Sequence, residues 1–392
     1  MNTGSPRFPL ATSTWDEAEH EALQRVIAGG RFTMGPEVRA FEEEFASFLG
    51  VRHAVMVNSG SSANLIALAA AVVAPDVDLR AGDEVIVPAV SWATTYYPVH
   101  QLGLRLRFVD IDPNTLNLDV DQVAAAVTDK TKAVLAVNLL GNPADLVALS
   151  ALAEERGLVL LEDNCESLGA TIDGRQAGTF GALGTYSSFF SHHISTMEGG
   201  LVVTDDDYLY QASVSLRAHG WTRELPTDNL VHPKTGDAFD DLFRFVLPGY
   251  NVRPLEMSGA LGREQLIKLP GLVAGRRENA ARFVEIFGGR DDVRIQRENG
   301  QSSWFGFSFV LQGRLTGRRR EVVSALSARG IESRPIVAGN FTRNPVMAHL
   351  DAVVPDRLPV ADEIHTDGLF VGNHHYPIPA ELDLLAEVLD SL

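Results

Sequence analysis

Lysine and cysteine are both scarce in this chain of 392 residues. The only lysines are Lys130, Lys132, Lys234 and Lys268, whereas arginine is frequent. Cys165 is the only cysteine, which excludes a disulfide within the chain and any metal cluster held by several of its cysteines. We expect Cys165 to be a small buried side chain, because that is the usual environment of a free cysteine.

Long apolar segments and excess positive charge are missing as well. No run of eighteen apolar residues is present, and the first residues do not resemble a signal peptide, so we expect a cytoplasmic protein without a membrane partner. The formal net charge of −18 argues against a broad nucleic-acid surface, so an anionic small-molecule partner would need local arginines. With 45% hydrophobic residues, the chain is long enough for two domains with substantial cores.

Strand and helix patterns alternate along the first half of the chain. Short apolar segments typical of buried strands are followed by longer segments with helical periodicity. This alternation predicts an α/β fold with a mainly parallel central sheet and helices on both faces. Strands are predicted at 53–57, 84–88, 104–110, 133–138, 158–161 and 201–205, and helices at 36–49, at 119–127 and in an apolar segment ending near residue 74.

Charged helices become more frequent in the last third of the chain. We therefore divide the chain into a large domain, residues 1–250, and a smaller α+β C-terminal domain, residues 251–392. Within the smaller domain, residues 302–309 (SSWFGFSF) are predicted to form a strand that alternates between core and surface.

Polar and small residues follow several predicted strands, where α/β enzymes keep their chemistry. Strand 53–57 runs into Asn58-Ser59-Gly60-Ser61-Ser62, whose hydroxyls and exposed N–H groups at a helix N-terminus would bind an anion. This turn lacks the spacings of the dinucleotide fingerprint and the P-loop, so a single phosphate fits better. Trp92 follows strand 84–88, and Asp163 and Glu166 follow strand 158–161. Alternatively, Trp92 is a core residue, and the two acidic residues are a helix N-cap and its capping-box partner.

The segment Ser187–Gly200 (SSFFSHHISTMEGG) places His192 and His193 side by side between two predicted strands. One interpretation is an ordinary hairpin with two surface imidazoles. The other is a catalytic loop, since an imidazole can take and give a proton near neutral pH.

Together these segments resemble the sugar aminotransferase branch of the fold-type I pyridoxal phosphate enzymes. The resemblance extends from Asn58 into the C-terminal domain. In that family a serine is followed, after four intervening residues, by the lysine that forms the Schiff base. Glu-Gly-Gly begins six positions after this lysine. Counting from Ser187 and from Glu198 leads in both cases to His192. Because imidazole cannot take over the covalent bond, the resemblance implies noncovalent pyridoxal or pyridoxamine phosphate and a histidine that moves protons.

The resemblance also implies roles for individual residues. Trp92 would stack on the pyridine ring, and Asp163 would keep the ring nitrogen protonated so that the ring accepts electrons. Gly249-Tyr250-Asn251-Val252-Arg253 resembles a family motif at a dimer interface, so we expect a homodimer with active sites built from both chains. The implied cofactor-binding residues are Gly60, Ser61, Ser62, Trp92, Asp163, Glu166, Ser187 and Asn251; the substrate-binding residues are His219, Arg223, Arg253 and Arg334, with Arg334 facing the cleft beside the Gly339-Asn340 loop; no metal site is expected.

Two branches of this family carry histidine at the lysine position, and one of them uses an iron–sulfur cluster. A single cysteine favours the branch without a cluster, whose members remove the C3 hydroxyl of a nucleotide-linked 4-keto-6-deoxy sugar. The resemblance then implies L-glutamate as the amino donor, 2-oxoglutarate and ammonia as by-products, and His192 as base and then acid. A sugar aminotransferase is an alternative but needs lysine at this position, and a noncatalytic cofactor-binding regulator is another.

Overall fold

The computed structural model describes residues 6–392. The larger sheet has eight strands in the order β1-β9-β8-β5-β4-β2-β3-β13. Its neighbouring strands are parallel, except that β9 runs antiparallel to both β1 and β8. The strands are β1 His53–Val57, β2 Glu84–Pro88, β3 Arg105–Val109, β4 Thr131–Val137, β5 Val159–Asp163, β8 Leu183–Ser187, β9 Gly200–Thr204 and β13 Ala352–Val353.

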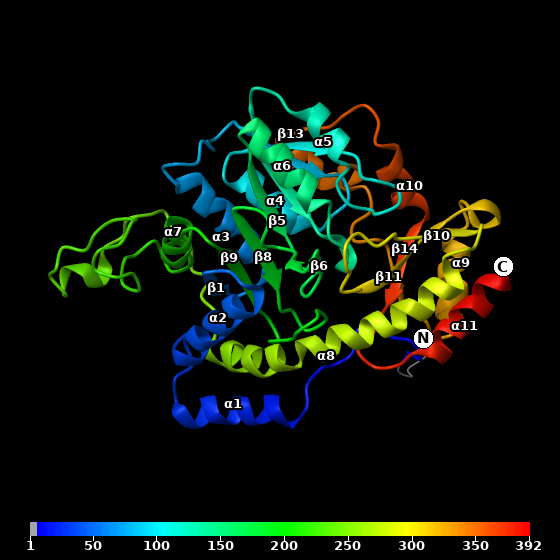
Figure 1. Ribbon diagram of the computed structural model, residues 1–392, viewed down its shortest axis with the longest axis horizontal. Helices are drawn as coiled ribbons and strands as arrows, with labels where there is room; N and C mark the ends of the chain where they lie inside the picture. The colour runs from blue at the N-terminus through cyan, green and yellow to red at the C-terminus, as the bar shows by residue number, and fades with distance from the viewer. Residues whose placement is uncertain (1–5) are drawn as a thin grey trace.

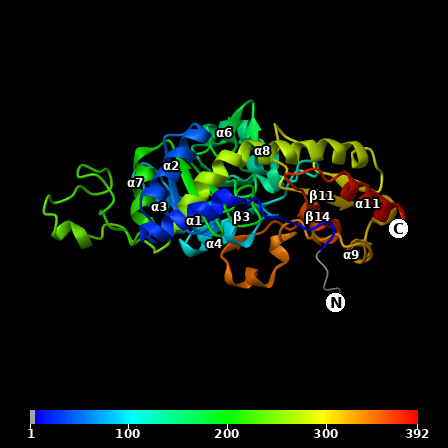
Figure 2. The same ribbon diagram turned by 90° about the horizontal axis from the view of Figure 1, so that it is seen from below.

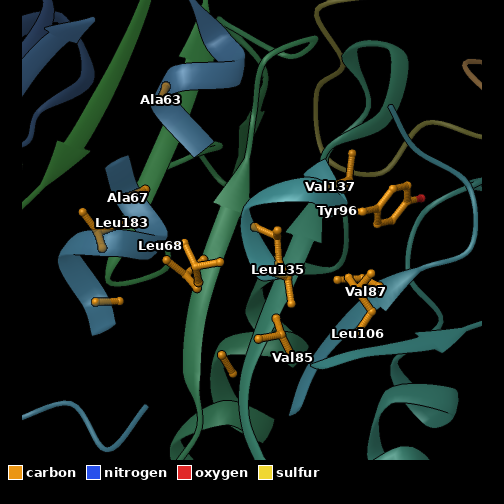
Figure 3. Packing of buried hydrophobic residues seen from close by; sticks show 14 of the residues in the cluster. Ala63, Ala67, Leu68, Val85, Val87, Tyr96, Leu106, Leu135, Val137 and Leu183 are labelled. Atoms are coloured by element: carbon orange, nitrogen blue, oxygen red, sulfur yellow. The ribbon is translucent and has the colours of Figure 1, made fainter. Parts of the chain in front are cut away.

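Successive residues of the central strands face two different cores. Val85 and Val87 of β2 pack with α3 and α4, whereas Ile86 packs with α5 and α6 on the other face. Figure 3 shows Ala67 and Leu68 of α3 beside Leu183 in the first of these cores. One face is covered by α3 Gly60–Val73, α4 Ala93–Gln101, α7 Asp207–Arg217 and α10 Pro359–Asp367, and the other by α2 Pro36–Leu49, α5 Val120–Ala126, α6 Leu146–Arg156 and the first half of α8 Glu256–Phe287.

The predicted fold class is confirmed by this arrangement, a mainly parallel sheet with helices on both faces. The predicted strands 53–57 and 84–88 coincide with β1 and β2, and the ends of the other four lie within two residues of the observed ones. Continuous apolar runs could be located from sequence because a parallel sheet buries both faces of its central strands.

A second, four-stranded sheet in the order β10-β11-β14-β12 lies in the C-terminal part. The expected alternation of residues 302–309 between core and surface is wrong, since β11 begins only at Gly306 and is buried throughout. Phe307 and Phe309 face one core and Val310 faces another, so both sides of the strand are covered. The remaining elements are β10 Val293–Ile295, β11 Gly306–Leu311, β12 Ser333–Arg334, β14 Gly368–Gly372, the hairpin β6 Thr171–Ile172 and β7 Arg175–Gln176, and helices α1 Glu17–Gly29, α9 Arg319–Ala328 and α11 Pro379–Asp390.

Helix α8 joins the parts of the molecule, running along the larger sheet and on toward the smaller one (Figure 1). Its first half packs on α1 and α2, and its second half adds Phe283 and Phe287 to the core of the smaller sheet. Phe8 also packs in that core, whereas β13 pairs with β3 at the edge of the larger sheet. The division into residues 1–250 and 251–392 stays a prediction, and residues 1–5 lie outside the described part of the chain.

Residues 218–255, which we call the arm, connect α7 to α8 and extend away from the rest of the chain (Figure 1, Figure 2). Phe239, Phe243 and Phe245 of the arm are exposed by 83%, 67% and 58%. Clustered exposed aromatics of this kind mark surfaces that bind other macromolecules. No helix within residues 6–392 combines the length and apolar character that crossing a membrane requires.

Candidate active site

Five parallel strands of the larger sheet end at the same edge, and the residues that follow them line one cavity of about 380 Å³. This is where open α/β sheets bind their ligands, because loops and helix N-termini converge there. Gly60 follows β1, Trp92 follows β2, Asn138 follows β4, Asp163 ends β5 and Ser187 ends β8.

The serine-rich turn after β1 caps helix α3 beside this cavity. The Ser59 hydroxyl accepts a hydrogen bond from the Ser62 N–H at 3.1 Å, and the Ser62 hydroxyl donates to Asn58 Oδ1 at 2.6 Å. Ser61 lines the cavity, whereas Ser62 does not. Gly60 is required because a Cβ there would lie 2.7 Å from the Ser187 Cβ. A helix N-terminus with hydroxyl groups at this place can hold a phosphate.

Asp163 is only 5% exposed, and its carboxylate is held by several donors. Oδ2 accepts from Asn64 Nδ2 at 2.8 Å and from the Thr95 hydroxyl at 2.7 Å, and Oδ1 accepts from the Cys165 N–H at 3.2 Å. These bonds fix the direction of the carboxylate. No helix starts after Asp163, so the alternative of an N-cap with a capping-box partner is wrong.

Two neighbours of Asp163 also line the cavity. Burial raises the pKa of Glu166 to about 7, although one of its oxygens accepts the Leu140 N–H at 3.0 Å. Cys165 is half-buried rather than part of the core, because the chain turns into the cavity wall where β5 ends. Burial raises the pKa of its thiol well above the usual range, which keeps the thiol protonated.

Trp92 is 57% exposed and lines the cavity at the start of α4, so the alternative of a core residue is wrong. An indole ring left exposed beside a helix N-terminus offers a flat face to a planar ligand.

The loop between β8 and β9 is braced by its own hydrogen bonds. The Ser188 N–H donates to the Gly199 carbonyl at 3.0 Å, and the Thr196 N–H donates to the Ser188 carbonyl at 2.9 Å. A Cβ on Gly200 would lie 2.4 Å from the backbone of Ser59, so the end of the loop packs directly on the serine turn. This close packing fixes the loop relative to the cavity.

His192 is the histidine of this loop that lines the cavity. Its half-buried ring packs edge-on against Phe305 and Phe189, with centroids 5.2 and 6.0 Å away. Burial, with a smaller contribution from the charge of Arg276, lowers the pKa of His192 to about 4. The imidazole is therefore neutral at pH 7 and can accept a proton.

His193 is 1% exposed, and its Nε2 lies 3.1 Å from the Ser303 carbonyl. The interpretation as a hairpin with two surface imidazoles is therefore wrong. The two neighbouring rings differ in environment, and the structure brings His192 rather than His193 to the cavity.

Four of the predicted residues lie outside this cavity and gather around Trp221 at the base of the arm. The guanidinium of Arg223 lies 4.0 Å from the Trp221 ring centroid and that of Arg253 lies 5.6 Å from it. The His219 ring contacts the same indole, and Asn251 accepts from Arg253 Nε at 3.0 Å. This cluster is close to the serine turn, because the Val252 carbonyl accepts the Asn58 N–H at 2.9 Å.

Arg334 also lies away from His192, contrary to the expected position facing the cleft. It lines a separate cavity of about 240 Å³ together with Arg319 and Arg320, because β12 is the edge strand of the smaller sheet. Asn340 is buried and donates to Asp362 at 2.6 Å. Val337 is the residue of this segment that reaches the central cavity.

The cavity also contains residues that the sequence reasoning missed. Asn64 lines the cavity and, together with Thr95 outside the lining, holds Asp163. Both lie near the N-termini of helices that begin beside the singled-out residues Gly60 and Trp92, which was a usable signal. Phe305 and Val337 line the cavity from the C-terminal part, where no local pattern indicates a site.

The donor set of this cavity fits pyridoxal or pyridoxamine phosphate. A helix N-terminus with Ser61 could hold the phosphate, Trp92 could cover the ring, and the Asp163 carboxylate could bind the ring nitrogen. None of the four lysines lines the cavity, so a covalent bond to lysine is not available there. Within residues 6–392, no group of three or more His, Cys, Asp or Glu side chains could hold a metal ion.

Residues 13–387 match the DegT/DnrJ/EryC1/StrS aminotransferase family, and the chain belongs to this family. It is similar to the GDP-4-keto-6-deoxy-D-mannose 3-dehydratase of Yersinia pseudotuberculosis, with 52% identity over 384 residues that cover 97% of this chain and 98% of that protein. The resemblance inferred from sequence is thereby confirmed.

Two solved structures of GDP-4-keto-6-deoxymannose 3-dehydratase have the same fold, each with a TM-score of 0.95 and 51% identity over 98% of this chain and 100% of theirs. One is a histidine-to-asparagine variant with bound GDP-perosamine. The other contains a trapped PLP–glutamate geminal diamine.

Proposed function

We propose that this chain removes the C3 hydroxyl of GDP-4-keto-6-deoxy-D-mannose and releases a 4-keto-3,6-dideoxy sugar and ammonia. L-Glutamate regenerates the noncovalently bound pyridoxamine phosphate and leaves as 2-oxoglutarate. The observation that carries the proposal is His192 in a cavity that no lysine lines, since an aminotransferase of this family needs lysine there. We choose GDP as the nucleotide because the similar dehydratase is named for a GDP-linked sugar and a solved structure of such a dehydratase contains GDP-perosamine.

Several residues of the cavity would hold the cofactor. Gly60, Ser61 and the N-terminus of α3 would bind the phosphate, with Ser62 supporting the turn through Asn58. Trp92 would cover one face of the ring. Ser187 at the end of β8 and Glu166 in the segment after β5 would also contact the ring. Asp163 would keep a proton on the ring nitrogen. When bound, pyridoxamine phosphate supplies the amine that joins C4 of the sugar and a ring that accepts electrons.

His192 would carry the proton in this reaction. Its pKa of about 4 keeps the imidazole unprotonated at neutral pH, so it can accept a proton from the methylene carbon that bears the amine. The resulting imidazolium is a strong acid and can give a proton to the departing C3 hydroxyl. Phe305 and Phe189 restrict the ring to the cavity wall while it performs both tasks.

A homodimer with shared active sites completes the proposal. No arginine or lysine lines the central cavity among the described residues, yet glutamate and a nucleoside diphosphate are both anionic. His219, Arg223, Asn251 and Arg253 gather instead at the base of the arm, whose exposed aromatics favour contact with a second copy. They would reach the neighbouring subunit's cavity.

The decisive experiment incubates the purified protein with pyridoxal phosphate, L-glutamate and GDP-4-keto-6-deoxymannose. Ammonia and a 4-keto-3,6-dideoxy sugar are the expected products. A stable 4-amino sugar that retains its C3 hydroxyl would instead make the chain an aminotransferase. Bound cofactor without turnover of either kind would favour a regulator.

A further inference from the structure

Arg276 lies in the middle of helix α8 and is 6% exposed. Its Nη1 donates to the Phe305 carbonyl at 3.0 Å and to the Asn373 carbonyl at 2.7 Å. Its Nε is buried without a hydrogen-bond partner. Among the described residues no carboxylate forms an ion pair with it, and burial lowers its pKa to about 10. At pH 7 it is therefore a buried cation whose hydrogen bonds go to two backbone carbonyls.

The packing around Arg276 is tight and fixes its position. A Cβ on Gly275 would lie 2.1 Å from the His375 carbonyl oxygen, so the backbone of α8 directly contacts the segment 373–375. The Asn373 side chain donates to the carbonyls of Arg276 and Trp304 at 3.1 and 2.9 Å. These contacts tie α8 to the chain just before Phe305.

Phe305 connects this buried cation to the active-site loop. Its carbonyl accepts from Arg276, and its ring packs against both His192 and His193, with centroid distances of 5.2 and 5.7 Å. Its N–H donates to the Leu140 carbonyl at 3.1 Å. Phe305 is thus held from two sides while its ring forms part of the cavity wall beside His192.

The charged and titratable groups around His192 come from several elements. Arg276 on α8 and the neighbouring His193 lie behind the cavity wall, and burial, followed by Arg276, lowers the pKa of both histidines. On the cavity side, the lining groups are Asp163, Cys165 and Glu166 after β5, and the exposed Glu198 of the loop. None of these acidic groups is hydrogen-bonded to His192.

We propose that Arg276 is a positioning residue for proton transfer: its guanidinium holds Phe305 against the His192 ring and places an uncompensated positive charge behind that ring. This inference rests on the proposed role of His192. The same charge makes the imidazolium, once formed, a better proton donor to a leaving hydroxyl, because a nearby cation destabilises it.

The test titrates His192 itself by NMR of protein labelled at the histidine ring carbons, with the His192→Asn variant assigning its signal. Wild type, Arg276→Gln, Arg276→Lys and Arg277→Gln are compared, without cofactor and loaded with pyridoxamine phosphate. Arg276→Gln keeps a donor for the carbonyls but removes the charge, whereas Arg276→Lys keeps the charge. Arg277→Gln is the matched control, since Arg277 is the next residue of α8 and binds the carbonyls of Ser302 and Gly169.

The expected result is an upward shift of the His192 titration by about one pH unit in Arg276→Gln. Arg276→Lys and Arg277→Gln should leave it close to that of wild type. The dehydration rate should fall toward low pH, because protonated His192 cannot act as base. In Arg276→Gln the pH at which the rate falls should shift upward together with the His192 titration. This pH dependence distinguishes a positioning role from a merely structural one. A structural role would lower the rate without changing the pH at which the rate falls.

A folded Arg276→Gln protein whose His192 titrates as in wild type would overturn the proposal. If that variant does not fold, Arg276→Met, which also removes the charge, takes its place and should show the same upward shift. Wild-type titration at or above the ordinary pKa of 6.5 would also contradict the proposal. Failure of the proposed dehydration would appear differently, as absent turnover in wild type with the His192 titration still shifted.

Discussion

Replacing His192 by asparagine would remove the titratable ring and keep a smaller polar side chain. We expect dehydration to slow by about 10²–10⁴-fold, the usual contribution of general acid–base catalysis. That range corresponds to about 3–5 kcal/mol of transition-state stabilisation. Binding of pyridoxamine phosphate should be retained, because the proposed contacts to the phosphate, ring and ring nitrogen come from other elements.

The same substitution should have a smaller effect on folding. The Nδ1 atom of His192 has no hydrogen-bond partner, so its removal leaves no protein group unpaired. The lost contacts are the two edge-on pairs with Phe305 and Phe189, each worth about 0.5–1.5 kcal/mol. Asparagine restores part of this packing, so the free energy of unfolding should fall by about 1–2 kcal/mol.

A single-turnover assay separates these two effects. Protein loaded with pyridoxamine phosphate is mixed with GDP-4-keto-6-deoxymannose, ammonia release is followed, and unfolding is measured in denaturant. His349→Asn is the matched control at an exposed imidazole and should keep full activity. His193→Asn should mainly cost stability, because this ring is buried beside Phe305. A loaded His192→Asn protein that turns over within about tenfold of wild type would refute the assignment of His192 as proton carrier.

Four further outcomes are expected. Borohydride treatment of the loaded protein should leave Lys130, Lys132, Lys234 and Lys268 unmodified, and a pyridoxyl-lysine found by peptide mass analysis would disprove noncovalent binding. Mixing the inactive variants His192→Asn and Asn251→Ala should restore some activity, whereas inactive heterodimers would contradict shared sites. Arg223→Ala should raise the glutamate concentration needed for pyridoxamine formation by roughly ten-fold, if about 1.4 kcal/mol of binding is lost; an unchanged glutamate dependence would leave Arg223 as a surface charge. Glu166→Gln should stabilise the cofactor-free protein at pH 8 by up to about 1–3 kcal/mol in denaturant unfolding, because the buried carboxyl, with its pKa raised to about 7, binds a proton more tightly when folded and so costs stability as pH rises from 4.5 through 7. Nearly equal stability at pH 4, below both pKa values, is the control, and equal stability at pH 8 would contradict the raised pKa.

Much of the larger sheet could be predicted from sequence because its signals are local. The strands at 53–57 and 84–88 each contain an apolar run, at 54–57 and 85–87, and both match the structure residue for residue. The polar residues after such runs had to meet at one edge of the sheet, since parallel strands all end there. This reasoning located Gly60, Trp92 and Asp163 on the wall of a single cavity, and the family resemblance added Ser187.

The rest depended on contacts between distant segments. Phe305 and Val337 reach the cavity only because α8 and the smaller sheet bring the C-terminal part beside His192. The same is true of β13, which pairs with β3 across almost 250 residues of chain. The alternation predicted for 302–309 failed because a second core covers the face that would otherwise meet solvent. The place of Arg334 likewise follows from an edge strand that no local pattern reveals.

The environment of His192 explains why imidazole suits this position better than the lysine it replaces. A lysine side chain here would lie beside the same two phenylalanine rings and in the region of the buried charge of Arg276. Two desolvated cations repel, so such a lysine would lose its proton and become a nucleophilic amine that binds the cofactor aldehyde. Imidazole loses its proton in the same surroundings but forms no such bond, and its acid form gives the proton up readily. The cavity therefore favours a residue that can take a proton from the cofactor's methylene carbon and give one to the hydroxyl that leaves C3 of the sugar.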